Sequence, residues 1–123
     1  MTFRDIAYQA QRDMLNLRPA QVSSTDVYAD LFKIMNRMID EWAFERFFVY
    51  VGTPGAYTIL AAFPDQITDY TFAPGYVSFL EKALAVGAFP AMKIYGKFDS
   101  PEMKQLETEV VQLRRALEGV GVV

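Results

Sequence analysis

The chain has 123 residues, a formal net charge of −3 and a composition that is 52% hydrophobic, which is typical of one folded domain rather than of a disordered chain. It contains no cysteine and no histidine, so disulfides, thiol nucleophiles, histidine-based triads and Cys/His metal sites are excluded. Charges of both signs are spread along the sequence without a basic stripe, which disfavours sequence-specific binding of nucleic acid.

The first predicted element is a helix over residues 2–17. Its opening, MTFRDIAYQAQR, is charged throughout and lacks the apolar region of a signal peptide. Thr2 and Asp5 have the spacing of a capping pair at a helix start. Apolar side chains then repeat at helical spacing from Phe3 to Leu17. Pro19 disfavours helical geometry in the residue before it, so the helix is expected to end there.

A second helix is predicted from residues 23–25 to about Arg46, because the small hydroxyl side chains of SST can accept the free backbone donors of a first turn. Phe44 is expected to point almost opposite to the apolar face of this helix. We predict Trp42 and Met38, together with Leu80 of the next helix, as core residues. The apolar side chains that share one face of the helix are Val27, Tyr28, Leu31, Ile34, Met35, Met38, Ile39 and Trp42.

The segment FFVYVGTPGAYTIL predicts a β-hairpin over about residues 47–62. Two runs of aromatic and β-branched residues flank GTPG, whose glycines supply the positive φ angles that a turn needs. The connector that follows is irregular, with a short extended piece expected at residues 67–72.

A third helix is predicted to open at Pro74, a favoured first-turn residue, and to run to Tyr95. Pro90 is expected to bend it, and a division into two helices near residue 88 is the alternative. Residues 73–96 form the most apolar long stretch. Charged residues, Pro90 and glycines interrupt this stretch, so it predicts a buried helix and not a membrane span.

The fourth helix is predicted to follow a Ser100 cap, with Pro101 as its first residue and Gly119 as its stop. Its apolar residues form a narrow seam: Met103, Leu106, Val110, Leu113 and Leu117. The seam has two open interpretations, packing on the domain's own core or docking on a partner. The valines after Gly119 favour a partner, because apolar side chains at an unpacked chain end gain nothing from burial.

The acidic residues give no catalytic pair. Asp40 and Glu41 are adjacent on one predicted helix and therefore diverge, and Glu107 and Glu109 diverge likewise. The glycine-containing segments lack the spacing of a phosphate-binding loop or a dinucleotide fingerprint. We therefore expect no enzyme activity, no catalytic or metal-binding residue and no cofactor.

The hairpin, in contrast, has apolar or aromatic residues on both of its faces. A two-stranded hairpin is marginally stable alone, so one face is expected to meet an identical subunit. The residues predicted for this subunit interface are Phe47, Phe48, Tyr50, Tyr57 and Ile59.

Two segments resemble the head-to-tail adaptor proteins of tailed bacteriophages, the family that includes packaged-DNA stabilisation proteins. YADLFKIMNRMIDEW is similar to the family's signature of hydrophobic residues and one asparagine before a tryptophan. FAPGYVSFLEKALAVGAFPAMKIYG is similar to a later segment of the family. The matching residues are Leu31, Met35, Asn36, Met38, Trp42, Pro74, Gly75, Tyr76, Leu80, Leu84, Ala85, Tyr95 and Gly96.

The resemblance implies a mainly α fold, a bundle of about four helices with one β-hairpin inserted between the second and third helices. It implies a single adaptor-like domain over residues 1–123. Such a protein forms a ring of identical subunits, expected to be a dodecamer, under the portal protein of a filled capsid. There it helps to retain packaged DNA and provides the attachment surface for the next tail or nozzle component.

The resemblance also implies a location and a set of contacts. The protein would be made in the host cytoplasm and would reside in the neck of the virion. DNA would pass its channel without sequence-specific binding, and no membrane is involved. The C-terminal helix and tail, residues 100–123, would act as the docking arm. The residues expected to contact the portal are Leu106, Val110, Leu113, Arg114, Arg115, Leu117, Val120, Val122 and Val123.

Two other functions fit the same residues. A small cytoplasmic helical module for protein–protein interaction would form a stable monomer or dimer with no affinity for a portal. A carboxylate-dependent hydrolase would need two acidic residues in one pocket, and the spacing of the acidic residues offers no such pair.

Overall fold

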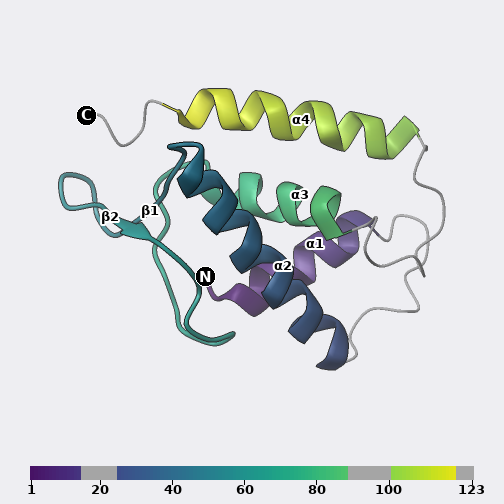
Figure 1. Ribbon diagram of the computed structural model, residues 1–123, viewed down its shortest axis with the longest axis horizontal. Coiled ribbons are helices and arrows are strands. Elements are labelled where there is room, and N and C mark those ends of the chain that lie inside the picture. The colour runs from purple at the N-terminus through teal and green to yellow at the C-terminus, as the bar shows by residue number, and fades with distance from the viewer. Residues whose placement is uncertain (15–24, 89–100, 119–123) are drawn as a thin grey trace.

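A computed structural model describes residues 1–14, 25–88 and 101–118, and it confirms the predicted architecture. The chain is mainly helical, with one antiparallel hairpin between the second and third helices (Figure 1). The elements in chain order are α1 (Phe3–Met14), α2 (Thr25–Phe44), β1 (Val49–Val51), β2 (Thr58–Leu60), α3 (Tyr76–Ala88) and α4 (Pro101–Leu117).

Helix α1 begins with the predicted capping pair. The backbone N–H of Asp5 donates to Oγ1 of Thr2 over 3.2 Å, and the backbone N–H of Thr2 donates to Oδ2 of Asp5 over 3.0 Å. These backbone and hydroxyl hydrogen bonds from Thr2 lower the pKa of Asp5, because they favour the charged carboxylate. The helix buries Phe3, Ile6 and other residues of one stripe, as its periodicity predicts.

Helix α2 buries the face that its sequence pattern selects. Leu31, Met35, Ile39 and Trp42 are buried, whereas Phe44 is 91% exposed. The helix ends at Phe44, two residues before the predicted end at Arg46. The prediction of Trp42 and Leu80 as core residues is therefore confirmed. Met38 is half-buried and packs against the edge of the core.

The hairpin pairs Val49 with Leu60 and Val51 with Thr58. Its loop contains Gly52 and Gly55 at φ angles of 115° and 85°. These are the positive φ angles that the glycines of the loop were predicted to supply. Val49, Val51 and Leu60 are buried against the helices, so one face of the hairpin completes the core.

The connector after the hairpin is attached to α2 by hydrogen bonds. The side-chain amide of Asn36 donates to the carbonyl of Phe63 over 3.1 Å and accepts from the N–H of Phe63 over 2.8 Å. One side chain on α2 thus satisfies both backbone groups of a connector residue, as a β-strand would. The predicted extended piece at residues 67–72 is present only as an isolated bridge between Val51 and Phe72.

Helix α3 begins at Tyr76 rather than at Pro74, and the predicted start of this helix is therefore wrong by two residues. Gly75 takes a φ of 90°, which is incompatible with a helix, so Pro74 and Gly75 form a turn before it. The predictions for Pro90 and Tyr95 lie outside the described residues.

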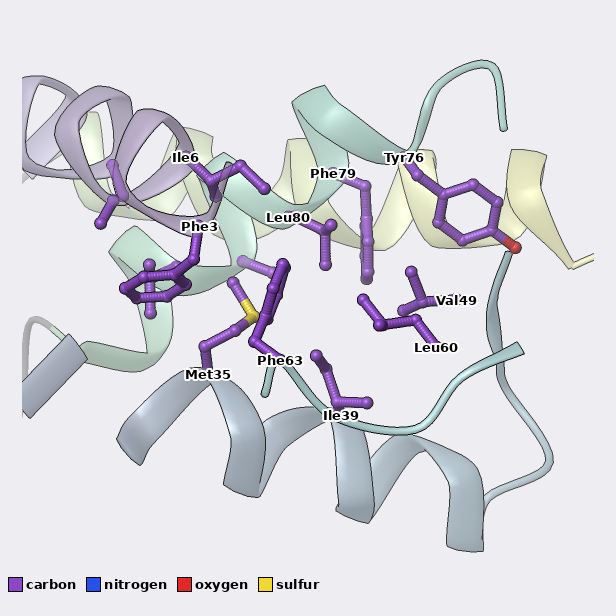
Figure 2. Packing of buried hydrophobic residues seen from close by; sticks show 14 of the residues in the cluster. Phe3, Ile6, Met35, Ile39, Val49, Leu60, Phe63, Tyr76, Phe79 and Leu80 are labelled. Carbon is purple, nitrogen blue, oxygen red and sulfur yellow. The ribbon is translucent and has the colours of Figure 1, made fainter. Parts of the chain in front are cut away.

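Side chains from α1, α2, α3 and the hairpin converge in one core (Figure 2). The ring of Phe79 lies 5.0 Å from the ring of Trp42 and 5.3 Å from the ring of Phe47, between centroids. Figure 1 shows α4 lying along α3 as an outer layer, and Lys82 of α3 binds Glu109 of α4 with a 2.9 Å ion pair.

The structure also tests the prediction of a buried third helix. Seven residues of α3 are buried, as expected for a helix packed between neighbours. Across the described helices, none is long and apolar enough to cross a membrane.

Candidate functional site

Two pockets lie on either side of the residues that join α2 to β1. The α4 pocket has a volume of about 370 Å³ and is formed between this junction and α4. The hairpin pocket has a volume of about 150 Å³ and is formed between α2 and the hairpin. The residues that line the α4 pocket are Glu45, Arg46, Phe47, Phe48, Tyr50, Tyr76, Arg114, Leu117 and Glu118. The residues that line the hairpin pocket are Ile39, Asp40, Ala43, Phe47, Phe48, Val49, Ile59, Leu60 and Ala61.

The junction is a Schellman-type helix end. The N–H of Phe47 donates to the carbonyl of Trp42 over 2.8 Å, and the N–H of Arg46 donates to the carbonyl of Ala43 over 3.0 Å. Arg46 has a φ of 66° and is the non-glycine residue at which the described chain takes a positive φ. The rings of Trp42 and Phe47 lie 6.0 Å apart, which is the apolar contact that often accompanies this motif. The motif turns Phe47 inward and leaves the side chain of Arg46 exposed at the α4 pocket.

Arg114 closes one side of the α4 pocket. Its guanidinium lies 2.8 Å from the carboxylate of Glu45 and 3.9 Å from that of Glu118, and 4.8 Å from the centre of the Phe47 ring. Arg114 was predicted to flank a portal contact. Here it connects α4 to the end of α2, so its charge is already neutralised within the chain.

Tyr76 forms the inner wall of the same pocket. Its hydroxyl donates to the carbonyl of Phe48 over 2.9 Å. Burial raises the pKa of Tyr76 to about 12, and the nearby Tyr50 adds to the shift. A phenol with this pKa stays protonated at neutral pH, so its role is that of a hydrogen-bond donor and not of a base.

The structure divides the predicted subunit-interface residues into three groups. Phe47 is 4% exposed and belongs to the core, so its assignment to an interface is wrong: the Schellman turn directs its ring towards Trp42 and Phe79. Phe48, Tyr50 and Tyr57 are half-buried. Ile59 is 51% exposed and is free to contact another molecule.

Phe44 was not among the residues predicted for this interface. The available signal was its position opposite to the apolar face of α2, which predicts an exposed aromatic ring. Its neighbour Ala43 lines the hairpin pocket, so an exposed aromatic ring and an apolar hollow lie next to each other on the surface.

The predicted docking seam of α4 faces the protein's own core at its C-terminal end. Leu117 is 6% exposed, and Val110 and Leu113 are half-buried against the core. Leu106 is half-buried, and Arg115 is exposed. Intramolecular packing therefore covers Leu117 and part of Val110 and Leu113, so Leu117 is not available to a partner in this fold. Val120, Val122 and Val123 lie outside the described residues.

The charged groups of the α4 pocket are joined in ion pairs. The carboxylates of Glu45 and Glu118 both pair with Arg114, an arrangement typical of structural ion pairs. Among the residues that the structure describes, no three acidic side chains come together as a candidate metal site.

Comparison of the sequence with protein-family models, with curated proteins and with solved structures finds no match for this chain.

Proposed function

We propose that this chain is a structural head-to-tail adaptor of a bacteriophage neck. It forms a ring of identical subunits, expected to be a dodecamer, under the portal, helps to retain packaged DNA and provides the surface to which the next tail component attaches. The observation that carries the proposal is the order of elements: two helices, a hairpin, then two helices. This is the order that the resemblance to phage adaptors implies.

The surface supports a role in assembly rather than in catalysis. Phe44, Ile59 and Ile67 are exposed by 91%, 51% and 72%, and large exposed apolar side chains are typical of surfaces that bind other proteins when they gather in one region. Phe44 and Ile59 lie at or beside the hairpin pocket. A net charge of −3 suits a channel that DNA passes without specific binding, because like charges repel.

The portal contact is proposed for Arg115, which is exposed on α4, and for Val120, Val122 and Val123, the predicted docking residues that lie outside the described part of the chain. The buried side of α4 serves instead to attach the arm to the domain.

The test is electron microscopy of the full chain, alone and mixed with the portal assembly of the same phage. The expected result is an additional ring under the portal. A chain shortened after Glu118 is expected to keep its circular dichroism spectrum and thermal midpoint but to lose portal binding. A full-length control in which the three tail valines are changed to serine separates apolar contact from tail length. Absence of a ring on the portal would overturn the proposal.

A second candidate function is a small helical module for protein–protein interaction that acts as a monomer or dimer. Burial of Phe47 and Leu117 within the chain favours it, because these residues need no partner to be covered. This function predicts the same small mass at every concentration and no affinity for a portal, which light scattering and the mixing experiment above would both detect.

A further inference from the structure

The outer face of α2 carries an exposed aromatic ring and a carboxylate one helical turn apart. Phe44 is 91% exposed and Asp40 is exposed, and their spacing of four residues places them on one side of the helix. Asp40 also lines the hairpin pocket, whose volume is about 150 Å³. An apolar cavity of this size holds a benzene ring, so the pocket is large enough for one aromatic side chain.

The outer face of α1 carries the opposite charge with the same spacing. Tyr8 is 42% exposed, and the guanidinium of Arg12 lies 5.9 Å from the centre of its ring. Within the described part of the chain, neither Arg12 nor Asp40 has an ion-pair partner.

The two faces match when two helices run antiparallel. On α1 the aromatic residue precedes the charged residue, whereas on α2 the charged residue precedes the aromatic residue. An antiparallel contact therefore brings Tyr8 opposite Phe44 and Arg12 opposite Asp40, with each pair one turn from the other. Arg12 then faces Asp40 at the edge of the hairpin pocket, with Tyr8 one turn away.

The two faces are also well separated in the molecule. In both Figure 1 and Figure 2, the C-terminal end of α2 lies near the hairpin and away from α1. A copy can thus use one face towards each of two neighbours.

We propose that the Tyr8/Arg12 face of one copy docks on the Phe44/Asp40 face and hairpin pocket of the next copy. This contact joins two different surfaces, and contacts of that kind form closed rings when the rotation between copies closes. The inference rests on the proposed function, since it names the contact that would build the adaptor ring.

A symmetric contact in which Phe44 enters the hairpin pocket of its partner is the competing arrangement. It would place Asp40 and Glu41 of one copy close to the same two carboxylates of the other. Like charges across an interface oppose association, so charge favours the contact between α1 and α2.

Charge reversal tests the proposal on the full chain. Arg12→Glu and Asp40→Arg are each expected to raise the dissociation constant of the assembly by about tenfold or more, because each places like charges in contact. An equimolar mixture of the two variants, or one chain carrying both changes, is expected to recover assembly because opposite charges again face each other. Sedimentation velocity measures the assembly, and Lys104→Glu on α4 is the control with the same charge change as Arg12→Glu.

Cross-linking provides a second, independent measurement, because the natural chain has no cysteine. Tyr8→Cys and Phe44→Cys variants are expected to form a disulfide dimer when mixed under oxidation, and neither is expected to do so alone. Dimers of Phe44→Cys alone would indicate the symmetric contact and overturn the proposal.

A failure of the proposed contact can be distinguished from a failure of the proposed function. If the wild-type chain assembles but neither charge reversal weakens it, the proposed contact is wrong while a ring formed through other residues stands. If the wild-type chain stays monomeric both alone and with the portal assembly, the contact and the proposed function both fall. Circular dichroism of each variant verifies that loss of assembly is not loss of folding.

Discussion

At the scale of single residues, Arg46 occupies a position that backbone geometry reserves for glycine. Its φ of 66° lies in the left-handed region, where a β-carbon crowds the following carbonyl. The Schellman hydrogen bonds hold Arg46 in this conformation, and the same turn directs the ring of Phe47 into the core. The strain of this conformation lowers the free energy of unfolding, and a substitution that removes the strain measures its size.

Arg46→Gly is therefore expected to raise the free energy of unfolding by about 0.5–1 kcal/mol, since the removed strain exceeds the added flexibility of the unfolded chain. Urea denaturation followed by circular dichroism measures the change. Glu107→Gly, at an exposed position inside α4, is the control, and it is expected to lower the same quantity by about 1 kcal/mol. Equal signs for the two variants would contradict the assignment of a left-handed helix end.

Tyr76 gives the stability of the protein a dependence on alkaline pH. Burial raises its pKa from 10.0 to about 12, so the folded state holds the phenolic proton more tightly than the unfolded state does. The resulting stability is complete below pH 10 and is lost as the pH rises towards 12.

Tyr76→Phe removes both this proton and the hydrogen bond to the carbonyl of Phe48. The variant is expected to be less stable than the wild type by about 1 kcal/mol at pH 7. The difference is expected to narrow between pH 10 and pH 12, because only the wild type loses this contribution. Urea denaturation of both proteins at a series of pH values measures it, and a constant difference would show that the phenol is not buried in the folded state.

At the scale of elements, one contact between α2 and α3 depends on a missing side chain. A β-carbon built at Gly87 would lie 2.6 Å from Sδ and 3.0 Å from Cε of Met38. Glycine at this position thus leaves room for the thioether of Met38, although glycine in a helix costs about 1 kcal/mol relative to alanine.

Gly87→Ala is expected to change the free energy of unfolding by no more than about 0.5 kcal/mol, because displacing the flexible thioether of Met38 offsets the gain in helix propensity. In a Met38→Ala background no displacement is needed, and the same substitution is expected to raise the free energy of unfolding by up to about 1 kcal/mol. The larger gain in the Met38→Ala background, measured by thermal or urea unfolding in a double-mutant cycle, is the critical result. The same change in both backgrounds would show that Met38 does not oppose a side chain at residue 87.

The elements themselves were largely predictable, because local signals determine them. The capping pair at Thr2, the apolar face of α2, the glycine loop of the hairpin and Pro101 at the start of α4 each act within a few residues. The start of α3 was missed because Pro74 is compatible with a helix and with a turn, and only the positive φ of Gly75 decides between them.

The candidate site was less predictable, because its residues come together only through the fold. The ion pair between Arg114 and Glu45 and the hydrogen bond between Tyr76 and Phe48 join residues far apart in the sequence, and no spacing rule indicates them. Gln11 is fully buried, and its side chain lacks a hydrogen-bond partner in the described structure. Its polarity alone would predict an exposed position on α1.

At the scale of the whole molecule, α4 decides how much of the chain is available for assembly. The apolar seam in the sequence of α4 does not distinguish a free docking arm from a helix that completes the core. The structure places Leu117 in the core and joins α4 to the rest of the domain through Lys82–Glu109 and Arg114–Glu45. The arm is consequently part of the domain at least as far as Glu118. Among the described residues, Phe44 and Ile59 are exposed apolar side chains at the end of α2 and on the hairpin.

Leu117→Ala tests whether α4 completes the core or is a free docking arm. If the helix completes the core, the substitution is expected to lower the free energy of unfolding by about 2–4 kcal/mol, because it removes buried methyl groups and leaves a cavity. Phe44→Ala is the matched control: its ring is 91% exposed, so a change within about 0.5 kcal/mol is expected. Both values are to be measured by urea denaturation at a concentration where light scattering finds a monomer. An unchanged stability for Leu117→Ala would mean that α4 detaches from the domain in solution, which would return its seam to the list of surfaces open to a portal.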